Sequence, residues 1–169
     1  MSHTREHADR RSGDDPGTWH LVWLDKTRWG PGPWQEEPDE VQWTDAATGL
    51  PCVACRHDVT GTWCGYVGVS AAHPWHGREA DALPTPVDAH RGLTFSGLRD
   101  NDTAHADWWW FGFHTMYTLD YAPGLMPYRA AHRTRPPGHT VYRSLDYVRT
   151  ECARLAGQLV NEGGIDGTV

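Results

Sequence analysis

A long apolar run is missing from this sequence of 169 residues. The first 17 residues, MSHTREHADRRSGDDPG, carry charges throughout, whereas a signal peptide or a membrane-spanning helix requires a continuous apolar stretch. We therefore expect a cytoplasmic protein without a membrane partner. Because these first residues also lack apolar anchors, we predict a disordered leader over residues 1–17 and a single domain over residues 18–169.

An excess of basic charge is missing as well. The chain has 15 Lys and Arg residues against 22 Asp and Glu residues, so its formal net charge is −7. Broad binding to DNA or RNA requires a basic stripe that replaces the phosphate counterions, and we therefore expect no extended nucleic acid partner. A local cationic site stays open, because four arginines gather late in the chain, at Arg129, Arg133, Arg135 and Arg143. Guanidinium groups suit phosphate and carboxylate groups, and a solvated loop is the alternative interpretation.

Cysteine is scarce, which argues against a disulfide framework. The four residues, Cys52, Cys55, Cys64 and Cys152, are expected to be reduced thiols in an intracellular protein. Cys52 and Cys55 have a spacing found in zinc sites, with His57 and Cys64 nearby as further ligands. If the segment is a strand, however, Cys52 and Cys55 point to opposite faces, where each thiol is simply a small apolar group. Both interpretations stay open.

Short strand-like segments recur along the chain before residue 115. Runs of apolar, β-branched and aromatic residues alternate with turns rich in Gly, Pro and polar residues, which predicts strands at 19–24, 41–43, 52–55, 62–69, 92–97 and 107–114. Two glycines inside one strand, Gly65 and Gly68, predict a bulge or the close approach of another group to the backbone. The connection from Ser70 to Arg91 is long and contains three prolines, which is typical of a segment that carries a site.

The clearest helix is the last element of the chain. Ser144 is a good N-cap, Asp146 lies in the first turn, and Gly163 with Gly164 would end the helix. An apolar stripe follows the helical period, at Leu145, Val148, Cys152, Leu155 and Leu159. The sequence therefore predicts an α+β fold, with a mostly antiparallel sheet and a C-terminal amphipathic helix packed on one of its faces.

The most unusual stretch is DWWWFGFHTMYTLD, from Asp107 to Asp120, in a chain with ten tryptophans. If Trp109 faces the helix and the core, strand alternation puts Trp108 and Trp110 together on the other side. Indole rings stack on planar bases, and arginines bind phosphate. We therefore predict a set of ligand-binding residues, Trp108, Trp110, Arg91, Arg129 and Tyr117. A core on both sides of the sheet is the alternative.

Histidines lie on or beside the loops around this stretch, at His73, His76, His90, His105 and His114. Imidazole titrates near neutrality, and carboxylates can orient it. One prediction is a divalent-metal site with His73, His76 and His90 as ligands, and a divalent metal is the one cofactor that these residues suggest. The other is an acid–base site of catalytic His90, His114 and Asp120. With eleven histidines in the chain, a chance cluster is the alternative.

At GLPC, CGYVGV, HPWHG, HRGLTF, WWFGF and YRSLDYVR the chain resembles a family of small conserved proteins of tailed bacteriophages, mainly those of actinobacteria. The resemblance covers about residues 26–159. It implies a phage origin and a cytoplasmic role in the infected bacterial host, and phage accessory proteins often act against host defence. It implies no particular reaction.

The chain departs from the family pattern at several positions, and three of them are candidate site residues. After WWFGF the family has Asp and His where this chain has His114 and Tyr117, while Asp120 is retained. In DAHRGLT the chain keeps His90 but has Arg91 where the family has glycine. The resemblance therefore implies that a cation has entered this loop, and that any Asp–His pair of the family is lost or rebuilt.

These features together predict a small phage-type accessory protein that binds a planar, phosphorylated small molecule. Sequestration of a host nucleotide signal is one concrete form of this hypothesis. Two alternatives stay open: a metal-assisted hydrolase of a nucleotide or phosphoester, and a protein-interaction module that docks exposed tryptophans on a host protein.

Overall fold

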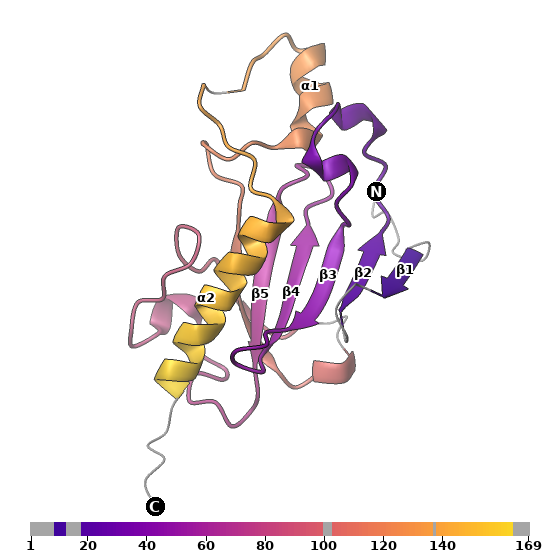
Figure 1. Ribbon diagram of the computed structural model, residues 1–169. Coiled ribbons are helices and arrows are strands. Elements are labelled where there is room, and N and C mark those ends of the chain that lie inside the picture. Colours follow the sequence, from indigo (N-terminus) through magenta and orange to yellow (C-terminus); the bar gives the residue numbers. More distant parts are fainter. Residues whose placement is uncertain (1–8, 13–17, 100–102, 137, 164–169) are drawn as a thin grey trace, which may run out of the picture.

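The fold is α+β, as the sequence predicts. The computed structural model describes residues 9–12, 18–99, 103–136 and 138–163. Within these residues one antiparallel sheet has the strand order β1-β2-β3-β4-β5-β7-β6, and a long helix crosses one of its faces (Figure 1). The strands are β1 (Asp9–Ser12), β2 (Trp19–Val22), β3 (Glu40–Thr44), β4 (Pro51–Arg56), β5 (Trp63–Val69), β6 (Phe95–Gly97) and β7 (Trp109–His114). The α-helices are α1 (Met126–Ala131) and α2 (Leu145–Gly163), and short 3₁₀ turns occupy several loops.

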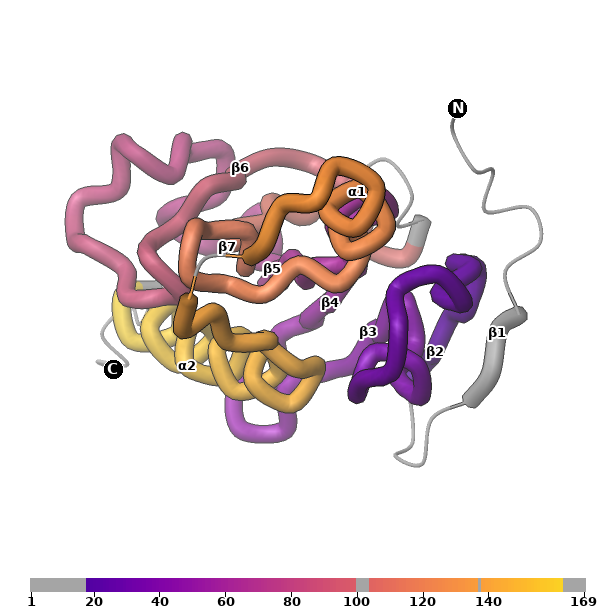
Figure 2. Tube along the Cα trace, turned by 90° about the horizontal axis from the view of Figure 1, so that it is seen from above, coloured from indigo at the N-terminus to yellow at the C-terminus, as the bar shows by residue number. Residues whose placement is uncertain are grey.

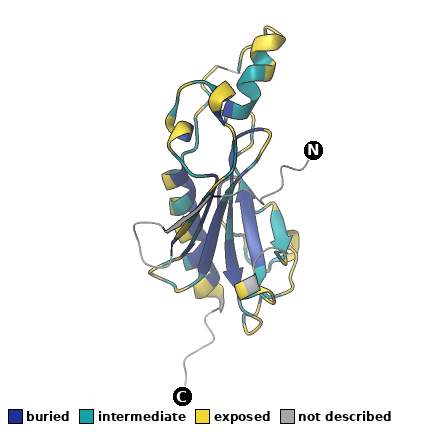
Figure 3. Ribbon diagram, turned by 90° about the vertical axis from the view of Figure 1, so that its right-hand side faces the viewer, coloured by how far each residue is buried: buried dark blue, intermediate teal, exposed yellow. Residues whose placement is uncertain are grey.

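Helix α2 has the start and the buried stripe that the sequence predicts. The backbone N–H of Tyr147 donates to the Ser144 hydroxyl at 3.3 Å, so Ser144 caps the first turn. The predicted apolar stripe is buried against the sheet, at Leu145, Val148, Cys152, Leu155 and Leu159. Figure 3 shows this division, with the centre of the sheet buried and α1 exposed at one end of the molecule. No described helix has both the length and the apolar composition needed to cross a membrane.

The predicted leader lies mostly outside the described residues. Within it, Asp9–Ser12 form β1, which pairs with β2 and lies at the edge of the sheet (Figure 1). This strand departs from the disorder that the sequence predicts for residues 1–17. The rest of the leader, and the extent of the domain from residue 18 onward, stay predictions.

The two glycines of β5 allow close packing, and β5 has no bulge. A Cβ atom at Gly65 would lie 2.8 Å from the Cys152 sulfur of α2 and 2.5 Å from the Phe113 ring. A Cβ atom at Gly68 would lie 3.1 Å from the Trp110 ring on the opposite face. The predicted close approach of other groups to this backbone is therefore confirmed.

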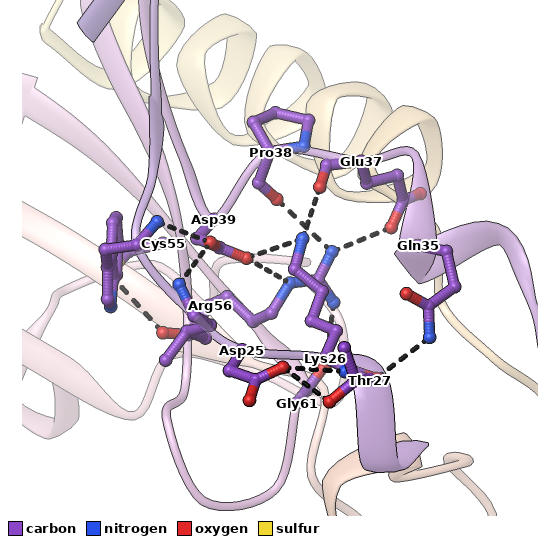
Figure 4. A network of polar contacts seen from close by, with 12 residues as sticks. Asp25, Lys26, Thr27, Gln35, Glu37, Pro38, Asp39, Cys55, Arg56 and Gly61 are labelled. Carbon is purple, nitrogen blue, oxygen red and sulfur yellow. Dashed lines mark hydrogen bonds and ion pairs between the residues drawn. The ribbon is translucent and has the colours of Figure 1, made fainter. Parts of the chain in front are cut away.

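A buried network of charged side chains joins the loop before β3 to the end of β4 (Figure 4). The Arg56 guanidinium lies 2.9 Å from a Glu37 carboxylate oxygen, and its Nε atom lies 3.3 Å from an Asp39 oxygen. Lys26 Nζ lies 2.8 Å from the same Asp39 oxygen. The side chains of Arg56 and Asp39 are both 0 % exposed. Two cations and two carboxylates therefore compensate one another away from water.

The same network fixes the start of α2. One Glu37 oxygen accepts the backbone N–H of Leu145 at 2.9 Å, which satisfies a free donor at the helix N-terminus. The other Glu37 oxygen accepts the Tyr142 hydroxyl, and Arg56 donates to Tyr142 at 2.9 Å. The guanidinium also stacks over the Trp63 ring at 4.2 Å. Each charge in the network therefore has a structural partner, which assigns the network to stability.

Candidate functional site

The sheet order brings two distant loops together beside β7. Strand β6 runs antiparallel to β7, so the residues that precede β6 lie next to those that follow β7. This places His90 and Arg91 beside the segment from His114 to Asp120. The end of the connection to α2 joins them, because Val141 exchanges backbone hydrogen bonds with both Leu119 and Tyr121 at 2.8 Å. In Figure 2 the orange chain that leads into α2 passes beside β7.

A buried histidine–carboxylate pair lies at the centre of this convergence. His90 Nε2 lies 2.8 Å from an Asp120 carboxylate oxygen, and His90 Nδ1 lies 2.7 Å from the Tyr147 hydroxyl. The Asp120 side chain is 2 % exposed and that of His90 is 5 % exposed. Asp120 also accepts Arg143 Nε at 3.0 Å and the backbone N–H of Tyr117 at 3.1 Å. The carboxylate therefore has three donors that hold it in place.

Arginines and aromatic rings surround the pair on its outer side. Arg91 lies over the Tyr117 ring at 5.2 Å, and Arg143 lies over the Tyr147 ring at 4.8 Å. His114 stacks on Tyr117, with 4.6 Å between ring centroids. We call this set the His90 cluster; its members are His90, Arg91, His114, Tyr117, Asp120, Arg143 and Tyr147.

The environment shifts the pKa values of three members. Burial alone would raise the pKa of Asp120, but the donors from His90, Arg143 and Tyr117 outweigh burial and lower it. Burial and the nearby His90 lower the pKa of His114, so its ring is neutral at pH 7. Burial raises the pKa of the Tyr147 hydroxyl. The cluster therefore presents a carboxylate, a neutral imidazole and a protonated phenol at neutral pH.

The loop that carries His90 and Arg91 is held in a strained turn. Arg91 has a φ of 56°, in the left-handed region that side chains other than glycine rarely adopt. The Asp88 backbone is fixed to α2, because Gln158 accepts its N–H at 2.8 Å and donates to its carbonyl at 2.7 Å. Strain of this kind is found most often at binding and catalytic sites. The turn holds the Arg91 cation above Tyr117.

The structure assembles only part of the predicted sites. It brings together five of the predicted residues, His90, His114, Asp120, Arg91 and Tyr117. Tyr147 and Arg143 complete the cluster; the sequence indicated Arg143 only as part of a possible cationic segment, and it did not predict Tyr147 as a site residue. Their position at or just before the N-terminus of a helix was the available signal, since the N-terminus of a helix favours bound anions.

The predicted metal ligands do not converge. His73 Nε2 lies 2.9 Å from the Leu159 carbonyl, and its Nδ1 accepts the Trp75 N–H at 3.0 Å, so both ring nitrogens are occupied. His76 Nε2 lies 2.7 Å from the Asp107 carbonyl. In the part of the chain that the structure describes, no three His, Cys, Asp or Glu side chains lie where they could hold a metal ion. The prediction that His73, His76 and His90 form one ligand set is therefore wrong.

The cysteine arrangement follows strand alternation. Cys52 belongs to the core beneath α2, whereas Cys55 lies on the opposite face and pairs directly with Cys64 of β5. Cys52 is therefore separated from the other two by the sheet. The structure favours the interpretation of these residues as individual thiols over a zinc site that combines all three.

The tryptophan prediction requires a correction. Trp109 packs against the core on the α2 side and Trp110 lies on the other side, as alternation predicts. Trp110 is 0 % exposed, however, because Gly68, Arg99 and His105 surround its ring. A buried indole offers no free face for stacking, so the predicted role of Trp110 as a stacking surface is wrong.

Trp108 and Arg129 lie apart from the His90 cluster. Trp108 precedes β7 and packs edge-on against His105, with ring centroids 4.9 Å apart. Arg129 belongs to α1 and donates to the Arg135 carbonyl at 2.9 Å. A pocket of about 160 Å³ has Trp19, His105 and Trp110 in its wall, but its described lining contains no arginine or lysine. The predicted combination of a tryptophan wall with a phosphate-binding arginine is not present there.

Comparisons of the chain with known protein families, curated proteins and solved structures give no match. The functional assignment therefore rests on the geometry of the His90 cluster.

Proposed function

We propose that the protein binds a phosphorylated small molecule at the His90 cluster. The observation that supports this most strongly is the position of Arg91 and Arg143, which flank the buried His90–Asp120 pair from two different segments. Among the described residues Arg91 has no carboxylate partner, so its charge is available to an anion. The net charge of the chain is −7, yet a cation occupies a strained turn at this position. A solvated surface loop does not require backbone strain, so the strain favours a binding role for Arg91.

The Tyr117 ring provides the contact for a planar part of the ligand. Arg91 covers one face of this ring, and it would move toward a bound phosphate and leave that face free. Guanidinium groups bind phosphate in two-point geometry, which fits two arginines on either side of one site. The ligand class is therefore a nucleotide-like anion. The phage origin, the cytoplasmic role and the sequestration of a host signal are parts of this proposal that rest on the family resemblance.

Calorimetry with ADP and with inorganic pyrophosphate at low ionic strength tests the proposal. We expect Arg91→Gln to weaken binding about tenfold or more, the effect of one lost charged hydrogen bond. The matched control is Arg129→Gln, which removes the same charge from α1 and should leave affinity unchanged. Equal effects of the two substitutions, or no binding of either probe by the wild type, would contradict the proposal.

Arg91→Gly separates binding from folding. Glycine adopts a φ of 56° freely, so this substitution removes strain together with the cation. We expect a protein at least as stable as the wild type that binds pyrophosphate about tenfold more weakly. A loss of stability would show that Arg91 serves the fold.

A second candidate function is acid–base turnover of the bound phosphoester. One observation favours it: the His90 ring bridges two groups, with Nε2 2.8 Å from an Asp120 oxygen and Nδ1 2.7 Å from the Tyr147 hydroxyl. In the tautomer whose Nε2–H donates to Asp120, Nδ1 accepts the hydrogen bond of the Tyr147 hydroxyl. His90 could then move a proton to and from Tyr147 beside the bound anion. Hydrolysis of p-nitrophenyl phosphate tests this, and Tyr147→Phe should abolish turnover while it preserves pyrophosphate binding. A wild type that binds without turnover would exclude this candidate and leave the binding function standing.

A further inference from the structure

The face of the sheet opposite α2 carries a row of titratable side chains across four strands. Glu40 of β3 is opposite Cys55 of β4, Cys55 is opposite Cys64 of β5, and Cys64 is opposite His114 of β7. Residues in direct register project from the same face. The two thiols therefore lie side by side in the middle of this row.

The spacing of the two cysteines suits a disulfide. The backbone N–H of His57 donates to the Thr62 carbonyl, so these two residues are a hydrogen-bonded pair of the hairpin. Hydrogen-bonded and non-hydrogen-bonded pairs alternate along an antiparallel ladder, and Cys55 and Cys64 lie two positions away, so they are also a hydrogen-bonded pair. The Cα atoms of such pairs lie about 5.5 Å apart, within the range of disulfides. Their Cβ atoms would have to approach by about 1 Å for the bond to close, which produces a disulfide that is easily reduced.

The two thiols differ in their surroundings. The Cys55 thiol donates to the Arg56 carbonyl at 3.8 Å. Burial raises the pKa of Cys64, but the Tyr66 hydroxyl bonds to its sulfur and the Arg99 cation is near, and both oppose that rise. The pKa of Cys64 stays raised overall. Cys64 is assigned as the attacking thiol because the Tyr66 hydroxyl and the Arg99 cation next to its sulfur can stabilise the thiolate once it forms, and Cys55 is then the resolving thiol.

A pocket gives access to the pair. It has a volume of about 260 Å³, and its wall includes Cys55, Cys64, Tyr66 and Trp23. Both thiols are half-buried, whereas Cys52 and Cys152 are almost fully buried beneath α2. Burial raises the pKa of Cys52 to about 12 and that of Cys152 well above its ordinary value. The chain therefore contains its own unreactive pair for comparison.

We propose that Cys55 and Cys64 form a reversible redox site that exchanges with low-molecular-weight thiols and disulfides. In the first step the Cys64 thiolate attacks a small disulfide, so that a mixed disulfide forms and one small thiolate leaves. In the second step the Cys55 sulfur attacks Cys64, the new S–S bond forms, and the second small thiol leaves. The two cysteine protons pass to the two leaving thiolates, so the protein is oxidised by two electrons and the small disulfide is reduced.

Incubation of the reduced full-length protein with oxidised glutathione tests the proposal. We expect two of the four thiols to disappear, and peptide mapping should find Cys55 linked to Cys64, with Cys52 and Cys152 still free. Reduced glutathione in excess should restore all four thiols. A wild type that keeps all four thiols, or a bond that includes Cys52 or Cys152, would overturn the proposal without any variant.

Single serine substitutions test the assigned order of attack. Cys55→Ser should accumulate one glutathione on Cys64, because the resolving thiol is gone, and Cys64→Ser should react at least tenfold more slowly. Both reactions should accelerate as the pH rises from 7 to 8.5, since each depends on a thiolate. Faster glutathionylation of Cys64→Ser than of Cys55→Ser would overturn the order. Thermal unfolding of each variant shows whether the fold is retained.

Discussion

Removal of the Arg56 charge should destabilise the protein severely. Arg56→Met replaces a guanidinium that is 0 % exposed and leaves the carboxylates of Glu37 and Asp39 with Lys26 as the remaining cation. Removal of one partner from a buried ion pair costs about 3–5 kcal/mol of unfolding free energy. For a chain of 169 residues, a loss of this size lowers the thermal midpoint by about 6–20 °C.

Urea denaturation followed by circular dichroism measures this loss. Arg56→Lys keeps the charge but loses the planar fork that reaches two carboxylates, so its stability should lie between wild type and Arg56→Met. Arg154→Met is the matched control, because its half-exposed side chain pairs with Glu151 at 3.2 Å and should cost less than about 1 kcal/mol. If Arg56→Met costs no more than Arg154→Met, the buried carboxylates are not charged in the folded protein and the reasoning is wrong.

Three further predictions concern pH and the core. Folding lowers the pKa of both His114 and Asp120, so unfolding takes up protons and the free energy of unfolding falls on acidification. The fall begins below about pH 6.5 for His114, and for Asp120 it occurs as the pH falls through its lowered pKa. When the urea midpoint is measured against pH, His114→Gln should remove the fall that begins near about pH 6.5. Trp110→Ala should cost about 3–5 kcal/mol and Trp108→Ala less than about 1 kcal/mol in urea denaturation, and equal losses would contradict the burial described. Leu155→Asp should abolish soluble expression, because it places a charge in the core, and a stable soluble variant would contradict the packing of α2.

The sequence predicted those parts of the fold that local patterns determine. Helix α2 was predictable from Ser144 to Gly163 because the cap, the stripe and the terminal glycines all lie within one segment. The strand positions followed from short apolar runs between turns. The placement of β6 outside β7 was not predictable, because it depends on the path of a long connection without regular structure.

The buried charges were not predictable from local patterns. Lys26, Asp39 and Arg56 have the sequence character of surface residues, and only the tertiary fold shows that they neutralise one another. The burial of Trp110 was only one of two open alternatives for a related reason. Alternation gives the face on which a side chain lies, but it does not give what covers that face.

The candidate site was predictable in its central residues. His90, Arg91, His114, Tyr117 and Asp120 stood out because of their residue types and their positions beside the tryptophan-rich strand. Tyr147 and Arg143 come from another segment, and their contribution depends on the backbone pairing of Asp120 with Val141. The metal ligand set failed because sequence proximity does not reveal that backbone carbonyls occupy the rings of His73 and His76.

An NMR titration of the ¹⁵N-labelled protein with inorganic pyrophosphate tests the central claim most directly. If the His90 cluster binds the anion, saturable shifts should appear at the backbone amides of Arg91 and Tyr117 and at the side-chain Nε–H groups of Arg91 and Arg143. The Nε–H group of Arg129 in α1 should stay in place. Shifts that spread over many surface arginines without saturation, or that are confined to Arg129 and its neighbours, would contradict the account.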